Sequence, residues 1–366
     1  MADREPQDAP SPWAFQIAKV AGIPVRIHFT FLLFLAWVGW SSQSRGGWQW
    51  VVLVISVFFC VILHEFGHAL AARKYGIRIT SITMYPIGGV AMLEGRLSPR
   101  QELWITIAGP AVNFIIAAAL YLYMLVSPQE FYLSPDIRQG GVLPALFFAN
   151  LNLGVFNLIP AFPMDGGRIL RAALATKLGD VRATRIAAGV GQLVAVVLGV
   201  VGVFSGQVEL MLIAFFVFIV AGQELTSTIT RSYLAGKKVR DAMLVRFVTL
   251  PHGATLSQAS DALLNGSQED FPVLSGEQVI GVLMRDGLAR GLAEEGPDGY
   301  VAGSMEREFP MCAPDDDLES IAEDFARKGY VPAMVMEGDQ LIGLLTHENL
   351  SEYIMLQDAV ARKMGR

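Results

Sequence analysis

Charged residues and cysteines are scarce in this chain of 366 residues. Only 17% of the residues are charged, whereas 53% are hydrophobic, a balance that is unusual for one water-soluble protein. The two cysteines, Cys60 and Cys312, are too few for a disulfide framework, and they indicate a reducing compartment for the C-terminal part. No basic stripe with interleaved aromatic residues occurs and the formal net charge is −6, so we expect no nucleic acid as a partner.

A signal peptide is also missing from the start of the chain. Residues 1–12 are polar and rich in proline, and no basic segment leads directly into a cleavable apolar core. We therefore expect residues 1–12 to be a disordered N-terminus.

Long apolar runs occur only before about residue 225, and acidic residues concentrate after residue 240. The runs have the length of membrane-spanning helices or come close to it. The six candidate segments are residues 27–40, 48–72, 103–126, 141–159, 186–204 and 208–225. The sequence therefore predicts a polytopic α-helical membrane protein with about six transmembrane helices, in contact with a lipid bilayer, followed by a soluble part.

Basic residues are unevenly distributed among the loops between these segments. Those after the second and fourth segments are Arg73, Lys74, Arg78, Arg96, Arg100, Arg168, Arg171, Lys177, Arg182 and Arg185, and Arg231, Lys237, Lys238 and Arg240 follow the sixth. The opposite side has only Arg45 and Arg138. Because loops rich in Lys and Arg stay in the cytoplasm, we expect a multi-pass protein of the cell membrane with both termini cytoplasmic.

The strongest chemical signal is the sequence His64-Glu65-Phe66-Gly67-His68, inside the second apolar segment. On a helix, residues four apart share a face, so both imidazoles can bind one metal ion while Glu65 stands beside it. In a membrane each charged side chain costs roughly 2.5 to 3.5 kcal/mol unless a metal ion or a water-filled cavity compensates. This cost favours a zinc site over a chance match.

A third zinc ligand is needed, because catalytic zinc sites usually have three protein ligands and one open position. Asp165 is the best-placed candidate, in the segment 157–168 at the end of the fourth apolar run. Pro160 and Pro163 break that helix, and the glycines at 166 and 167 permit a tight backbone that turns the carboxylate back toward the core. An aspartate in an ordinary turn is the alternative, since proline and glycine clusters often mark turns alone.

These motifs resemble the site-2 proteases, a family of intramembrane metalloproteases. The match covers about residues 13–235: His-Glu-x-x-His, Asn-Leu-x-Pro-x-x-Pro-Met-Asp-Gly-Gly after the fourth segment, and Gly-Ile-Pro-Val-Arg-Ile-His at residues 22–28. The resemblance implies that His64, His68 and Asp165 bind one zinc ion and that Glu65 is the general base. It also implies an endopeptidase that cleaves membrane-anchored proteins in regulated intramembrane proteolysis, such as an anti-sigma factor or a transcription-factor precursor.

Peptide hydrolysis also needs a hydrogen-bond donor for the oxyanion. Asn157 is the first candidate and resembles the family's asparagine, although an amide that bonds only to neighbouring helices is the alternative. Asn113 and Asn152 are weaker candidates for an oxyanion or substrate contact, because interhelical hydrogen bonding next to small residues also explains them.

Residues 79–94 alternate like two strands around Pro86-Ile87-Gly88-Gly89. An exposed strand edge could hold an unwound substrate by β-addition. The resemblance implies a hairpin that dips into the membrane, whereas the sequence alone is equally compatible with a plain cytoplasmic hairpin.

From about residue 237 short β-rich runs alternate with amphipathic stretches. The pattern repeats at a spacing of 62, which pairs Met243 with Met305 and Leu256 with Leu318. We therefore predict a disordered segment (1–12), a membrane domain (13–235) and two α/β modules (236–300 and 301–366).

The paired modules resemble cystathionine-β-synthase (CBS) domains, which often bind adenosyl ligands between their two copies. Thr346 and Asn349, in the second copy, match the family's ribose-recognising pattern with Asn in place of Asp, whereas the first copy has Met284 and Gly287 at these positions. The resemblance implies ATP, ADP or AMP as a ligand that modulates activity, and a homodimer formed through the CBS domains. A purely structural, oligomerising role is the alternative.

A membrane metal or ion transporter regulated by the CBS pair is the alternative function. A transport site would use the two histidines and Asp165, but it would not require Glu65 beside them. It would also be expected to show inverted repeats, which we do not find in the sequence.

Overall fold

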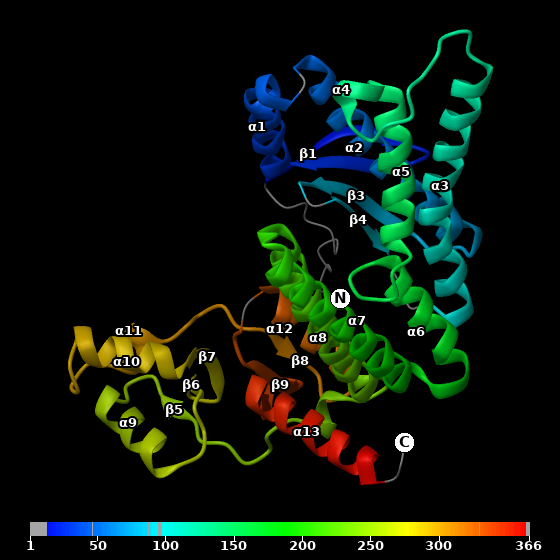
Figure 1. Cartoon of the computed structure of the whole chain (residues 1–366). Coiled ribbons are helices and arrows are strands. Elements are labelled where there is room, and N and C mark those ends of the chain that lie inside the picture. The colour runs from blue at the N-terminus through cyan, green and yellow to red at the C-terminus, as the bar shows by residue number, and fades with distance from the viewer. Residues whose placement is uncertain (1–12, 46, 87, 94–96, 329, 364–366) are drawn as a thin grey trace. The chain divides into compact units, whose positions relative to one another are not determined.

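The structure is a computed structural model that describes residues 13–45, 47–86, 88–93, 97–328 and 330–363. The segment predicted to be disordered, residues 1–12, lies outside the described residues. The chain forms two compact units, Met1–Thr228 and Ile229–Arg366. Helix α8 (Val208–Leu234) runs across the boundary between them (Figure 1).

Six apolar helices dominate the first unit. Among the described residues, four are long and apolar enough to cross a membrane: α2 (Trp48–Lys74), α3 (Pro99–Val126), α7 (Asp180–Ser205) and α8. Two are shorter, α1 (Phe29–Arg45) and α5 (Val142–Asn157). Each overlaps one of the six predicted segments. The first helix starts two residues later, because residues 27 and 28 end a strand, whereas α3 and α7 start earlier and α8 ends later than predicted. The polytopic helical membrane fold is confirmed.

The helices pack through small side chains. The buried face of α7 is formed by Ala183, Ala187, Ala188, Gly191 and Ala195, which let neighbouring backbones approach closely. Large apolar side chains on α7 and α8 point outward, including Leu193 (65% exposed), Phe204 (87%) and Phe215 (69%). This arrangement suits a lipid environment, where exposed apolar side chains have no cost.

A four-stranded sheet in the order β1-β2-β3-β4 accompanies these helices. Its strands are β1 (Ala14–Val20), β2 (Ile23–His28), β3 (Ile79–Tyr85) and β4 (Gly88–Leu93). The antiparallel pair β3–β4 confirms the predicted hairpin. Strands β1 and β2 are not anticipated by the sequence analysis. Strand β2 pairs with β3 in parallel and thereby joins the segment before α1 to the hairpin after α2.

Residues 165–178 form helix α6 (Asp165–Leu178), which was not predicted from the sequence. A short helix α4 (Ile137–Gly140) precedes α5. Gly166 and Gly167 serve close packing in the first turn of α6. A Cβ atom on Gly167 would lie 2.7 Å from the backbone carbon of Ala161, and one on Gly166 would collide with the Ile159 carbonyl oxygen. Both glycines are therefore needed for the approach of α6 to the preceding loop.

The second unit contains two copies of one α/β pattern. The first copy has η1 (Val239–Asp241), β5 (Leu250–Pro251), α9 (Leu256–Asn265), β6 (Phe271–Ser275), β7 (Gln278–Leu283) and α10 (Arg285–Glu294). The second has α11 (Val301–Ser304), β8 (Met311–Cys312), α12 (Leu318–Lys328), β9 (Ala333–Glu337), β10 (Gln340–Leu345) and α13 (His347–Lys363). Each copy forms a three-stranded sheet. The predicted pair of α/β modules is confirmed.

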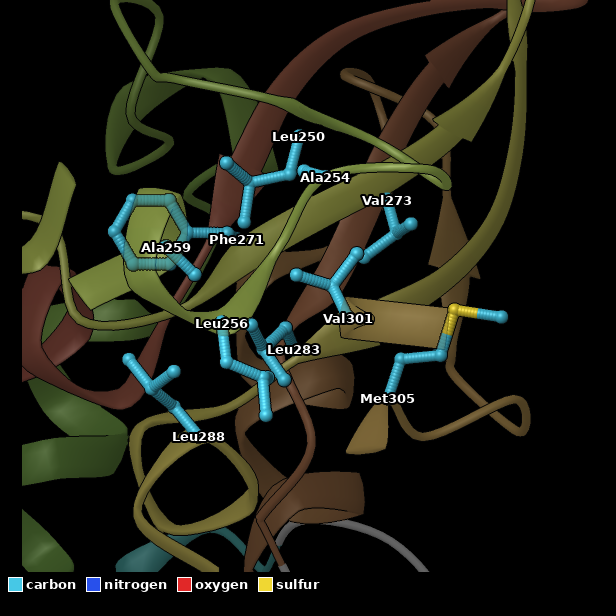
Figure 2. Packing of buried hydrophobic residues seen from close by; sticks show 10 residues of the cluster. All are labelled: Leu250, Ala254, Leu256, Ala259, Phe271, Val273, Leu283, Leu288, Val301 and Met305. Atoms are coloured by element: carbon cyan, nitrogen blue, oxygen red, sulfur yellow. The ribbon is translucent and has the colours of Figure 1, made fainter. Parts of the chain in front are cut away.

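The two copies exchange short segments. Val301 and Met305, at the start of the second copy, pack into the hydrophobic cluster of the first copy (Figure 2). In the same way Val239, at the start of the first copy, packs into the cluster of the second copy. Hydrophobic packing therefore crosses the predicted division at residues 300 and 301.

Candidate metal centre

Helix α2 presents the two histidines of the motif on one face. His64 is 5% exposed and His68 is partly buried, four residues further along the helix. Gly67 lets α2 approach α3 closely, because a Cβ atom there would lie 2.7 Å from the carbonyl oxygen of Ala108. The imidazoles thus face α3.

Asp165, the first residue of α6, meets both histidines. Its Oδ2 atom lies 3.2 Å from His64 Nε2 and 3.3 Å from His68 Nε2. The two Nε2 atoms are 3.1 Å apart. Ligands of a tetrahedral zinc ion with bonds of 2.0–2.1 Å would lie about 3.3 Å apart. The three atoms therefore have the spacing of three corners of a zinc tetrahedron.

Two further observations fit a cation among these atoms. Asp165 Oδ2 is buried and has no hydrogen-bond partner among the described residues, which would be costly without a positive charge nearby. Gly109 of α3 leaves space beside the rings. A Cβ atom there would lie 2.7 Å from His64 Nε2 and nearer still to His68 Nε2. Within the described part of the chain, His64, His68 and Asp165 are the one cluster of His, Cys, Asp or Glu with metal-binding spacing.

Helix α3 holds the far side of both rings. The Nδ1 atom of His68 lies 2.9 Å from the Ile105 carbonyl oxygen. The Nδ1 atom of His64 lies 2.5 Å from Asn113 Oδ1. Asn113 donates a hydrogen bond of 3.1 Å to Asn150 on α5. One helix therefore contacts both candidate ligands on the side away from Asp165.

Glu65 projects from the same turn of α2 and is half-buried. Gly89 of strand β4 packs against it, since a Cβ atom on Gly89 would lie 2.6 Å from Glu65 Cγ. The edge strand of the β3–β4 hairpin thus runs beside the candidate general base.

An ion-pair cluster anchors the helix that carries Asp165. Arg171 of α6 forms salt bridges with Glu102 of α3 and, at 2.8 Å, with Glu224 of α8. The phenyl ring of Phe162 lies 5.8 Å from the guanidinium carbon. This cluster ties α6 to two long helices, and no sequence spacing indicated it.

The asparagines predicted from the sequence lie in different settings. Asn157 ends α5, is half-buried, and donates to the carbonyl of Leu153 one turn earlier. Asn113 is fully buried against His64. Asn150, 1% exposed, is in this network, whereas Asn152, the weaker candidate from the sequence, is exposed. Asn150 and Asn152 are two residues apart on α5 and therefore point to different sides of the helix. The way α5 packs against α3 decides which of the two is buried.

In the second unit, Thr346 and Asn349 bond to each other. The Thr346 hydroxyl lies 2.9 Å from Asn349 Oδ1 and accepts a hydrogen bond from the Asn349 backbone N–H at the start of α13. Nearby, the Tyr330 hydroxyl donates to the Asp270 carboxylate at 2.5 Å and lies 3.4 Å from Glu348. Burial raises the pKa of Asp270 above its usual value.

A cavity of about 840 Å³ in the second unit is lined by residues of both copies. Its lining includes three acidic residues, Glu277, Asp316 and Asp339. Thr346 and Asn349 are not part of this lining.

Comparison with known proteins connects this site to a family. The family model described as Peptidase family M50 matches residues 52–139 and 134–198, and the CBS domain model matches residues 301–356. The chain is 35% identical over 340 residues to zinc metalloprotease MJ0392 of Methanocaldococcus jannaschii, covering 92% of this chain and 95% of the relative. It is 28% identical over 371 residues to the putative zinc metalloprotease Rip3 of Mycobacterium tuberculosis, covering 93% of each. A solved site-2 protease from Methanocaldococcus jannaschii is 42% identical and covers 58% of this chain and 95% of its own, with a TM-score of 0.46.

Proposed function

Because this chain belongs to peptidase family M50, the site-2 proteases, and is a membrane-embedded zinc metalloendopeptidase, we propose that His64, His68 and Asp165 hold its zinc ion. The observation that carries this proposal is the convergence of three ligand atoms within 3.3 Å of one another beside Gly109. The named zinc metalloproteases among its relatives support proteolysis, so the transporter alternative is not retained.

Glu65 is the proposed general base. When bound, zinc would supply Lewis acidity toward a peptide carbonyl and toward a water molecule. Glu65, next to His64 on α2, would take the proton from that water and pass it to the leaving amine. Asn157 remains the proposed oxyanion donor.

We further propose that the substrate is a membrane-anchored protein, such as an anti-sigma factor or a transcription-factor precursor, held as an added strand along β4. The contact between Gly89 and Glu65 supports this placement, because a strand paired with β4 would run past the general base.

The proposed orientation has both termini in the cytoplasm. Arg73 and Lys74 lie in the last turn of α2, whereas Trp40 and Trp48 lie exposed at the end of α1 and the start of α2. Basic residues mark the cytoplasmic side and exposed tryptophans mark an interface. His68 is five residues before Arg73, about 7.5 Å along the helix axis. The metal centre would therefore be close to the cytoplasmic surface.

For the second unit we propose regulation by an adenine nucleotide at Thr346 and Asn349, and a homodimer formed through the CBS copies of residues 236–300 and 301–366. The ribose-recognising pattern at the start of α13 supports the first idea, although Thr346 is buried and the two side chains hydrogen-bond to each other. Millimolar AMP or ATP is expected to raise the melting temperature of the full chain. No shift would exclude the nucleotide.

Metal analysis tests the proposed centre. We expect the purified wild-type chain to contain one zinc ion, and the Asp165→Ala variant to lose most of it, since two imidazoles alone leave the site incomplete. The matched control is Asp180→Ala, which removes an exposed carboxylate at the start of α7. Full zinc content in Asp165→Ala would exclude Asp165 as a ligand.

A further inference from the structure

Three positions of α3 face the metal centre at helical spacing. Ile105, Gly109 and Asn113 are four residues apart and therefore share one face of the helix. The first offers a backbone carbonyl to His68, the second leaves room for both rings, and the third offers a side-chain amide to His64. The far nitrogen of each imidazole thus has a partner on the same helix.

The partner of His68 fixes which of its ring nitrogens carries hydrogen. A backbone carbonyl oxygen can only accept a hydrogen bond. Because His68 Nδ1 lies 2.9 Å from the Ile105 carbonyl oxygen, Nδ1 is the donor. In the neutral ring the lone pair is then on Nε2, which is the atom beside Asp165.

The same reasoning applies to His64, through the side-chain amides of Asn113 and Asn150. Asn150 Nδ2 donates to the Leu146 carbonyl oxygen at 2.9 Å, which fixes the orientation of the Asn150 amide and turns its Oδ1 toward α3. Asn113 must then donate through Nδ2, at 3.1 Å. Its Oδ1 therefore faces His64 Nδ1, so that Nδ1 again carries the hydrogen and Nε2 the lone pair.

The burial of Asn113 argues against direct contact between its side chain and the substrate. Asn113 is 0% exposed, and both ends of its amide are occupied by His64 and Asn150. An oxyanion donor needs a free N–H directed at the reacting carbonyl. Asn113 uses one of its two amide hydrogens for Asn150, and its complete burial keeps the other away from a substrate carbonyl, in contrast to the candidate role drawn from the sequence.

We propose that Asn113 is a positioning residue, oriented by Asn150, that fixes His64 in the tautomer whose Nε2 lone pair points at the zinc ion. The Ile105 carbonyl does the same for His68. This inference rests on the proposed ligand roles of His64 and His68. It assigns to α3 the task of preparing both rings before the metal binds.

The test compares zinc affinity among variants of the full chain, by competition with a chromophoric chelator in detergent. Asn113→Leu keeps the volume but removes the acceptor, so we expect zinc binding to weaken about 10–100-fold. Asn113→Asp retains an acceptor for His64 Nδ1–H and should recover most of the affinity. Thr184→Val is the control, because this buried α7 hydroxyl has no hydrogen-bond partner among the described residues.

Cobalt substitution gives a readout that does not depend on activity. We expect the visible absorption bands of bound Co²⁺ to shift in Asn113→Leu and to match wild type in Thr184→Val. Wild-type zinc affinity and an unchanged cobalt spectrum in Asn113→Leu would overturn the inference, and the proposed zinc site would still stand. A wild-type chain without zinc would instead overturn the proposed site itself.

A milder variant covers the case in which Asn113→Leu does not fold. Asn150→Leu leaves Asn113 in place but removes the acceptor that orients its amide. We expect a smaller loss of zinc affinity in the same direction. Unchanged zinc affinity would show that the amide of Asn113 needs no support from α5. It would overturn the proposal that Asn150 orients Asn113.

Discussion

The two units bury different kinds of side chain. The first buries many alanines and glycines between its helices, together with polar groups such as Asn113, Asn150 and Thr184, besides a smaller number of large apolar side chains such as Phe162. The second buries large apolar side chains, among them Phe271 and Leu345. Lipid is as apolar as a leucine side chain, so burying leucine between membrane helices gains little, whereas in water it gains about 25 cal/mol per Å² of apolar surface. We infer that burial of large apolar side chains stabilises the second unit, whereas close packing of small side chains and polar contacts between helices contribute more to the first.

Glu65→Gln should have the largest effect of the variants considered, on cleavage. It would sharpen the contrast by showing that one polar side chain of the first unit controls activity without contributing to stability. Without the general base we expect cleavage of a membrane-anchored substrate to fall by about 10²–10⁴-fold. Zinc content and melting temperature should stay near wild type, because Glu65 is not a proposed ligand. The measurement pairs a cleavage assay in detergent or liposomes with metal analysis.

The control for this change is Glu209→Gln, an exposed glutamate in the first turn of α8, which should cleave like wild type. Retained cleavage by Glu65→Gln would exclude Glu65 as the general base.

Phe271→Ala should have the next largest effect, on stability alone. Phe271 is 1% exposed, and its truncation should destabilise the second unit by about 3–5 kcal/mol through lost burial and a cavity. Hydrogen exchange of β6 and α9 amides in the full chain, measured against denaturant, follows this loss. Zinc content should not change.

The counterpart in the first unit is Leu193→Ala on α7, where the side chain is 65% exposed. We expect a change within about 0.5 kcal/mol. An equal loss in both variants would break the comparison, since large apolar side chains would then matter equally in the two units.

The smallest effect concerns the pH dependence of the second unit. Burial raises the pKa of Asp270, while the hydrogen bond from Tyr330 opposes the rise. The folded unit therefore keeps this proton to higher pH than the unfolded chain, in which Asp titrates near 3.9. The resulting stabilisation is complete below that pH and is lost as pH rises through the folded pKa.

Asp270→Asn should remove this loss, because the side chain stays neutral at every pH. Melting curves of the second unit, recorded upward from pH 4, should fall less steeply than in wild type, and Glu294→Gln, an exposed carboxylate on α10, should follow wild type. Identical slopes for Asp270→Asn and wild type would contradict the assignment.

The sequence predicted the contacts that local geometry controls. His64 and His68 share a face because a helix repeats every 3.6 residues, and Asp165 was selected as an acidic group beside an apolar segment. The strands β7 and β10 were visible as repeated apolar runs at a spacing of 62. In each case a short stretch of chain carries the information.

The contacts that depend on tertiary packing could not be predicted in this way. Whether Asn150 or Asn152 faces the interior depends on how α5 is rotated against α3, and Arg171 meets Glu102 and Glu224 only after three helices have packed. Helix α6 was missed because Pro160, Pro163 and the two following glycines indicate a turn, whereas the glycines serve close packing.

The exchange of segments in the second unit means that one copy cannot be cut out along the repeat. Backbone hydrogen bonds join Leu244 to Leu344 and Val282 to Glu306, so each copy supplies a strand-like segment to the sheet of the other. A fragment ending at residue 300 would expose the surface that Val301 and Met305 cover. Two separate copies could cover both surfaces only by exchanging these segments. The second unit is therefore equivalent to a domain-swapped dimer fused into one polypeptide.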